Sequence, residues 1–235
     1  MTDSAKATVA AIAPYALWMA LMSVLPATAG GYAVRTAATA ATLFASLAWW
    51  RHSSPKSAVG SDAPPVRRAA ATFCVSVLAG LAVCFLWIFP ERFAAYREFS
   101  LLGLLGLAPS AAPETPSPYD PAVCGWTLSW VRLAGSAFII APVEEMFFRS
   151  FLYRWLQRGE WTKVPLSRFD LPAFLWMVGV FALEHHTRIC VGAMAGAAYG
   201  LLAIRRGLGS AIVAHAVTNF ALGLYVIHTG EWGFW

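Results

Sequence analysis

The sequence predicts an all-α protein, with residues 1–235 forming a single membrane domain of about seven transmembrane helices. Hydrophobic residues make up 59% of the chain and charged residues only 12%, whereas a soluble domain is about 25% charged. The mean hydropathy is +0.60. Apolar runs long enough to cross a bilayer, about 20 residues, alternate with polar or proline-containing linkers.

The first apolar run is interpreted as a helix that stays in the protein, although Ala27-Thr28-Ala29 leaves a cleaved signal peptide as the alternative. The stretch 101–108 is too short to cross a membrane and is expected at its interface. Residues 111–121 are rich in proline and predict a loop outside the bilayer. The expected spans are residues 9–25, 32–50, 69–89, 133–153, 171–186, 189–204 and 208–227.

The basic residues predict the orientation. With a cytoplasmic N-terminus, eleven of the 17 lysines and arginines fall in inside segments, mainly in linkers 51–68 and 154–168. Cytoplasmic loops carry such an excess, so we expect the N-terminus inside. Loss of the first helix would leave the same polarity. Arg35, near the outer end of the second span, is expected to snorkel toward the interface.

The fourth span contains Glu144, Glu145 and Arg149 inside an otherwise apolar run. A charge near the bilayer centre costs roughly 2.5–3.5 kcal/mol on insertion scales. Glu145 and Arg149 are four residues apart, so they share a helix face and can neutralise each other. Glu144 points about 100° away from Glu145 and has no such partner in its own helix. Glu144 is therefore the carboxylate expected to do chemistry.

Three later polar side chains lie in apolar runs: His185 near the end of the fifth span, and His215 with Asn219 in the seventh. His215 and Asn219 are four apart and face one side of their helix. At about 1.5 Å rise per residue, the depths of Glu144, His185 and His215 differ by about 11 Å. Helix tilt of roughly 20° and side-chain length allow these groups to converge.

These residues form three motifs in order on successive apolar helices: Glu144-Glu145-x-x-x-Arg149, Phe181-x-x-x-His185 and His215-x-x-x-Asn219. The set resembles the CAAX prenyl protease and bacteriocin-processing (CPBP, or ABI) family of intramembrane endopeptidases. The residues around Leu183-Glu184-His185 and from Gly192 to Tyr199 are also similar to a bacterial CAAX-protease-related subgroup found near exosortase systems. The resemblance implies a catalytic core over residues 126–229 and a bacterial inner (plasma) membrane.

The resemblance also implies roles for the site residues. Glu144 would be the general base, helped by His185; His215 and Asn219 would form an oxyanion hole, with Glu145 and Arg149 as the supporting pair. No cofactor is needed for this mechanism. The alternative is zinc held by Glu144, His185 and His215, which would leave an open fourth position.

Each of these residues also has a purely structural role as an alternative. Glu145 and Arg149 can be a packed ion pair only, and each histidine can be a packing group. Glu184 and His186 are expected at the interface, with His186 as the active imidazole if the register differs. The four-residue spacing of Gly192, Gly196 and Gly200 predicts close helix packing, and the tail 231–235 predicts an aromatic anchor.

The expected function is cleavage of a peptide bond in a membrane-associated peptide or protein, lipidated or membrane-anchored. The expected partners are that substrate and membrane lipid; the basic residues face the membrane and do not indicate nucleic-acid binding. The alternative is a non-catalytic membrane protein of the same fold, as an immunity protein or an assembly partner in protein sorting. A transporter would show repeats and broken midplane helices, and no clear repeat is found.

Overall fold

The computed structural model describes residues 1–50, 66–90, 116–185 and 188–235. Within these ranges the chain is helical and contains no strand. The elements are α1 (Asp3–Val24), α2 (Ala29–Trp50), α3 (Val66–Ile88), α6 (Pro121–Cys124), α7 (Trp126–Gly135), η4 (Ser136–Ile140), α8 (Ala141–Glu145), η5 (Met146–Leu152), α9 (Tyr153–Gln157), η6 (Trp161–Lys163), α10 (Leu171–Glu184), α11 (Ile189–Arg206), α12 (Leu208–Thr229) and η8 (Trp232–Phe234).

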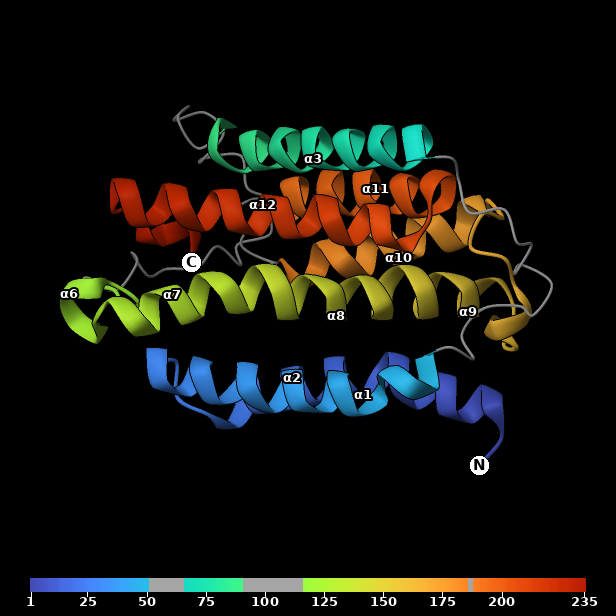
Figure 1. Ribbon diagram of the computed structural model, residues 1–235, viewed down its shortest axis with the longest axis horizontal. Helices are drawn as coiled ribbons and strands as arrows, with labels where there is room; N and C mark the ends of the chain where they lie inside the picture. Colours follow the sequence, from blue (N-terminus) through green and yellow to red (C-terminus); the bar gives the residue numbers. More distant parts are fainter. Residues whose placement is uncertain (51–65, 91–115, 186–187) are drawn as a thin grey trace, which may run out of the picture.

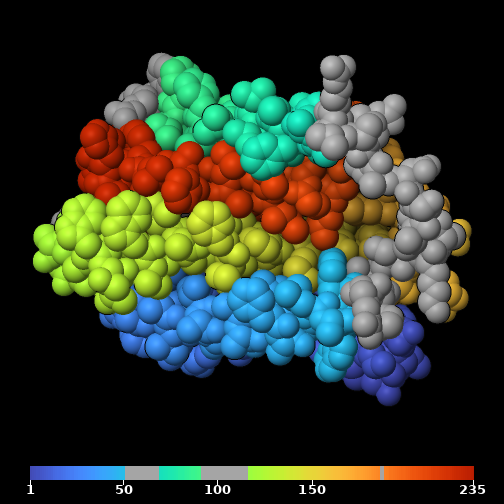
Figure 2. All heavy atoms as spheres, viewed as in Figure 1, coloured from blue at the N-terminus to red at the C-terminus, as the bar shows by residue number. Residues whose placement is uncertain are grey.

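The helices form layers around one long central helix, which runs continuously from α7 to α9 (Figure 1). The α1–α2 pair packs on one side of it, and α12 packs on the other. The α10–α11 pair lies beside α12, and α3 covers α12 from outside. The space-filling view shows these layers in direct contact along their length (Figure 2). The middle of the central helix is thereby covered by other helices on two sides.

Five described helices are long and apolar enough to cross a membrane: α1, α3 from Ala69, the continuous helix Trp126–Gln157, α11 and α12. The expectation of an all-helical membrane protein is confirmed. Helix α2 has 22 residues but is not among the five. The number of seven spans and the N-terminal orientation stay predictions. The expected interfacial stretch 101–108 and most of linker 51–68 lie outside the described residues.

Helix α10 is shorter than the span expected at 171–186. Asp170 begins it by accepting a hydrogen bond from the Ala173 amide at 3.0 Å, and it ends at Glu184 after 14 residues. That is about 21 Å, less than the roughly 30 Å hydrocarbon core. Past its end, Arg188 Nη1 donates to the Gly233 carbonyl at 3.0 Å and its guanidinium covers the Phe234 ring. The C-terminal tail therefore packs on the α10–α11 turn.

Two segments of the central helix are π-helical and flank the glutamate pair: η4 before α8, and η5 after it. Pro142 gives a physical reason for the first. Proline has no amide hydrogen, and its ring clashes with the carbonyl four residues earlier, here that of Phe138 in η4. The Ala141 amide donates instead to the Ser136 carbonyl five residues back. Such π-turns often occur at functional sites.

The small-residue stripe of α11 packs against α10, as its spacing predicts. A Cβ at Gly192 would meet the His185 Cβ at 2.9 Å, and one at Gly196 would meet the Phe181 ring at 3.0 Å. At Gly200 the nearest atom would be on Phe174, at 2.8 Å. Larger residues here would separate the two helices. The close packing brings the end of α10 against the centre of the bundle.

Candidate active site

The glutamate pair lies at the centre of the bundle, where α8 faces α12. Glu145 is fully buried, Arg149 is 1% exposed and Glu144 is 7% exposed. Arg149 Nη1 lies 3.0 Å from Glu145 Oε1, which confirms the ion pair predicted from their spacing. Arg149 also donates from Nη2 to the Gly196 carbonyl at 3.3 Å, and its guanidinium lies 4.2 Å from the Phe181 ring centre. Three helices therefore fix Arg149.

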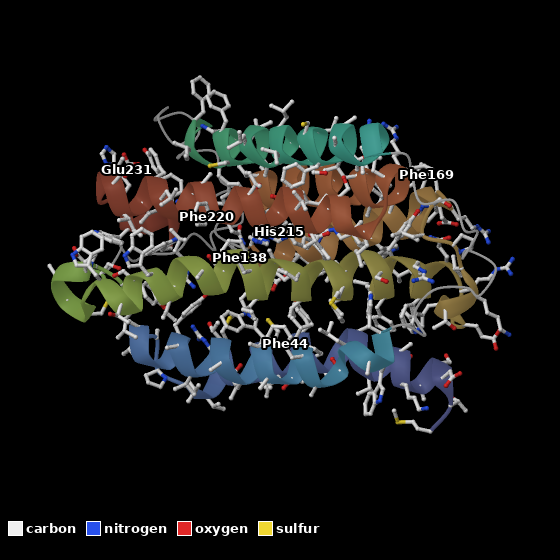
Figure 3. All side chains as sticks on the ribbon, in the orientation of Figure 1. Phe44, Phe138, Phe169, His215, Phe220 and Glu231 are labelled. Atoms are coloured by element: carbon white, nitrogen blue, oxygen red, sulfur yellow. The ribbon has the colours of Figure 1, made fainter. Side chains whose placement is uncertain are left out.

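His215 joins the two glutamates from α12, and Figure 3 shows it between the α12 and α8 ribbons. Its Nδ1 lies 2.9 Å from Glu145 Oε1, and its Nε2 lies 3.7 Å from Glu144 Oε2. The imidazole stacks on the Tyr199 ring at 4.7 Å between centres. Tyr199 in turn donates its hydroxyl to Thr218 Oγ1 at 2.7 Å. Stacking on Tyr199 and the hydrogen bond at Nδ1 therefore hold the His215 ring in place.

Asn219 is held one turn beyond His215 on α12. Its Nδ2 donates to the Ser136 carbonyl at 3.0 Å, the carbonyl that also accepts the π-helical hydrogen bond from Ala141. An amide nitrogen has two N–H donors, so one remains after this contact. The neighbouring Phe220 ring lies 5.9 Å from that of Phe138 on the facing helix (Figure 3).

His185 ends α10, and its Nδ1 lies 2.9 Å from the Phe181 carbonyl. Its ring centre lies 4.6 Å from that of Phe181 and 5.5 Å from that of Trp87 on α3. Phe181 also lies 6.0 Å from the His215 ring, so one aromatic ring packs between the two histidines. His186, considered as the alternative imidazole, lies outside the described residues.

The zinc alternative can be compared with the donor geometry. Glu144 and His215 present an oxygen and a nitrogen 3.7 Å apart, while His185 Nδ1 faces a backbone carbonyl. Among the described residues, no three His, Cys, Asp or Glu side chains form a group that could hold a metal ion. Of the proposed ligands, only Glu144 and His215 therefore face each other here.

Two residues at this site were not predicted from the sequence. Glu184 Oε2 is buried without a hydrogen-bond partner among the described residues, and its carboxyl repels that of Glu144 electrostatically. The Tyr15 hydroxyl of α1 interacts with the Glu184 carboxyl, while its ring stacks on Phe147 at 4.1 Å. Glu184, expected at the interface, is half-buried at the end of α10. A carboxylate directly beside the motif residue His185 was the available signal.

Together these contacts define an all-helical membrane protein with a buried, hydrogen-bonded cluster of carboxylates and imidazole at its centre. Residues 126–221 match the family model described as type II CAAX prenyl endopeptidase Rce1-like. The match covers all three motifs and confirms the predicted resemblance to the CAAX prenyl protease family over this segment. This similarity supports a protease, a class of hydrolase. Searches of curated proteins and of solved structures return no significant match.

Proposed function

We propose that this protein is an intramembrane endopeptidase that hydrolyses a peptide bond of a membrane-associated peptide or protein with a water activated by Glu144. One contrast carries the proposal. The Glu145 carboxylate is engaged at Oε1 by Arg149 and His215, and only its Oε2 is left without a hydrogen-bond partner among the described residues. Glu144 has no arginine partner: its buried Oε2 lies 3.7 Å from His215 Nε2 and accepts no hydrogen bond from the described residues. A carboxylate oxygen without a protein hydrogen bond is suited to accept a proton from water.

In the proposed reaction, a water oxygen attacks the scissile carbonyl carbon while Glu144 accepts one of the water protons. The carbonyl oxygen becomes an oxyanion, and donors from α12 stabilise it. The C–N bond then breaks as the Glu144 carboxyl returns its proton to the leaving amine. His185 would orient the water, as the resemblance implies. The products are a new carboxylate and a new amine, and Glu144 is regenerated.

The tautomer of His215 follows from its contact with Glu145. In its ion pair with Arg149, the Glu145 carboxylate only accepts hydrogen bonds. His215 Nδ1 therefore carries the proton in this contact. In the neutral ring Nε2 is then an acceptor, so His215 donates to an oxyanion only as an imidazolium. Asn219, which retains one N–H donor, supplies the oxyanion contact in either state.

The decisive experiment replaces Glu144 with Gln and assays the purified protein on membrane-anchored peptides. Gln keeps the shape and removes the basic oxygen, so cleavage should fall below detection while the detergent-solubilised protein stays folded. The matched control is Glu160→Gln, a surface carboxylate paired with Lys163, which should cleave like the wild type. Full activity of Glu144→Gln would refute the proposed mechanism.

The non-catalytic alternative predicts no Glu144-dependent cleavage of any membrane peptide, with folding and partner binding unaffected by Glu144→Gln. The intact set of Glu144, His185, His215 and Asn219 favours catalysis, because a scaffold would not require all four. The contact between the Tyr15 hydroxyl of α1 and Glu184 supports the proposal that the first helix is part of the working protein and is not a cleaved signal peptide. Thr28 accepts from the Gly31 amide at 3.1 Å, which gives the small residues before α2 a role in starting that helix.

We further propose seven membrane helices with a cytoplasmic N-terminus in a bacterial inner membrane. The positive charges of residues 51–68 and 154–168 support this orientation. Reporter fusions or cysteine labelling at residues 56 and 158 should report the cytoplasmic side. An outside signal from either position would reverse the orientation and leave the chemistry unchanged.

A further inference from the structure

A second polar cluster lies at the end of the bundle where α2 and α7 begin and the chain ends (Figure 1). Its centre is the Tyr32 ring. The guanidinium carbons of Arg35 and Arg132 lie 5.6 Å and 4.3 Å from the centre of this ring. Arg35 also covers Trp18 at 4.9 Å, and Arg132 covers Tyr119 at 4.7 Å. The two guanidinium cations therefore contact one cluster of aromatic rings.

Neither guanidinium has an anionic partner in the described part of the chain. Arg35 is only 6% exposed, and no carboxylate of the described residues forms an ion pair with it or with Arg132. The Nε atoms of both arginines are buried without a hydrogen-bond partner among the residues that the structure describes. Asp120, which precedes Arg132 by 12 residues, accepts a hydrogen bond from the Ala122 amide at 2.8 Å.

The energies indicate that aromatic contacts alone do not compensate these charges. A cation–π contact contributes roughly 0.5–1 kcal/mol at the surface and about 2 when desolvated. The effective penalty for burying an ion is several kcal/mol, and here two like charges lie against one ring. An anion that accepted hydrogen bonds from both guanidiniums would remove the repulsion and satisfy the donors, as forked Arg–phosphate pairs do.

The location indicates which anion is available. Trp126 and Trp130, 58% and 46% exposed, lie at the start of α7 near Arg132, and exposed tryptophans mark the headgroup level of a membrane. Arg132 precedes Glu144 by 12 residues on the same continuous helix, about 18 Å along its axis. A peptide carboxylate would reach it only from five or more extended residues beyond the bond at Glu144. In a phospholipid membrane, phosphate groups are present everywhere at the headgroup level.

We propose that Arg35 and Arg132, enclosed by Trp18, Tyr32 and Tyr119, bind the phosphate of one phospholipid headgroup at this end of the bundle. The headgroup ties α1, α2 and α7 together from the membrane side. This inference does not depend on the proteolytic function, because none of these residues contacts the Glu144 site.

The test uses the intact chain, purified in detergent and freed of lipid, with native mass spectrometry and thermal unfolding as readouts. The probes are dioleoylphosphatidylglycerol, dioleoylglycerol with the same acyl chains, inorganic phosphate, and a short apolar peptide with a free carboxyl end. One phosphatidylglycerol should bind saturably and raise the Tm, while dioleoylglycerol should not. Arg35→Gln/Arg132→Gln should bind the phospholipid roughly 10- to 100-fold more weakly, and Arg205→Gln, at the exposed end of α11, should bind normally.

Several outcomes would overturn the proposal. Equal binding of the phospholipid by the double variant and the wild type would show that the two arginines do not bind the headgroup. Inorganic phosphate that stabilises the chain as well as phosphatidylglycerol at equal concentration would make this a site for the free anion, and tighter binding of the peptide would make it a substrate site. If the double variant does not fold, the test uses the wild type with the two lipids. An equal Tm with phosphatidylglycerol and with dioleoylglycerol then contradicts the proposal.

Discussion

Around Glu145 the protein compensates buried charge within its own chain, since one carboxylate oxygen contacts Arg149 at 3.0 Å and His215 Nδ1 at 2.9 Å. Around Tyr32, two guanidiniums face aromatic rings with no carboxylate among the described residues. The first cluster lies at the centre of the bundle and the second at one end. The difference indicates that charges at the centre need a protein partner, whereas charges at the headgroup level can take one from the membrane.

The largest expected effect on the central cluster comes from Glu145→Gln. The substitution leaves Arg149 buried without its anion, and breaking one side of a buried ion pair costs about 3–5 kcal/mol. Thermal or denaturant unfolding in detergent measures the loss, and activity should fall with it because a neutral amide oxygen holds His215 Nδ1 more weakly than the carboxylate does. Glu160→Gln, which removes an exposed pair, is the control. Wild-type stability for Glu145→Gln would show that the pair is not what compensates the charge.

Asn219→Ala should lower the rate of cleavage by roughly 10²–10³, the cost of one oxyanion donor in known cases. The KM should change little, because the donor acts on the charge that develops during the reaction. The variant also removes the contact with the Ser136 carbonyl, so its Tm is measured alongside. Asn219→Asp keeps the size without the N–H donor and should be equally slow. An unchanged kcat in a folded variant would assign Asn219 to packing.

The smallest effect is expected at the pair that joins α1 to the site. Tyr15→Phe removes only the hydroxyl that interacts with Glu184, so cleavage should fall about tenfold or less, in line with roughly 1 kcal/mol per hydrogen bond. Glu184→Gln and the double variant complete a cycle. A coupling energy of at least about 0.5 kcal/mol is expected for residues in contact. Additive effects within about 0.3 kcal/mol would mean that Tyr15 acts independently of Glu184.

The sequence was most informative where the relevant contacts lie within one helix. The four-residue spacing of Glu145 and Arg149 predicts their ion pair, and the apolar runs predict an all-helical membrane protein. The π-helical segments beside Pro142 were not foreseen, because an apolar run does not distinguish a π-turn from an α-turn.

Contacts between helices were harder to predict. The contact between His215 and Glu145 depends on how α12 packs on α8. The order of the motifs along the sequence does not specify that packing. Arg35 was expected to snorkel toward the interface; the cover of its guanidinium by Trp18 of α1 is a contact between helices that its place in α2 does not predict. The burial of one Glu184 oxygen likewise depends on contacts between helices, which the residues around His185 do not specify.

The most direct test of the account measures cleavage and metal content in the same preparation. Purified wild type and Glu144→Gln are treated with a chelator, analysed for zinc, and assayed on a membrane-anchored peptide. Water activation by Glu144 predicts that the wild type cleaves with far less than one zinc per chain, unaffected by the chelator, and that Glu144→Gln is inactive. About one zinc per chain, with activity lost on chelation and restored by zinc, would contradict it.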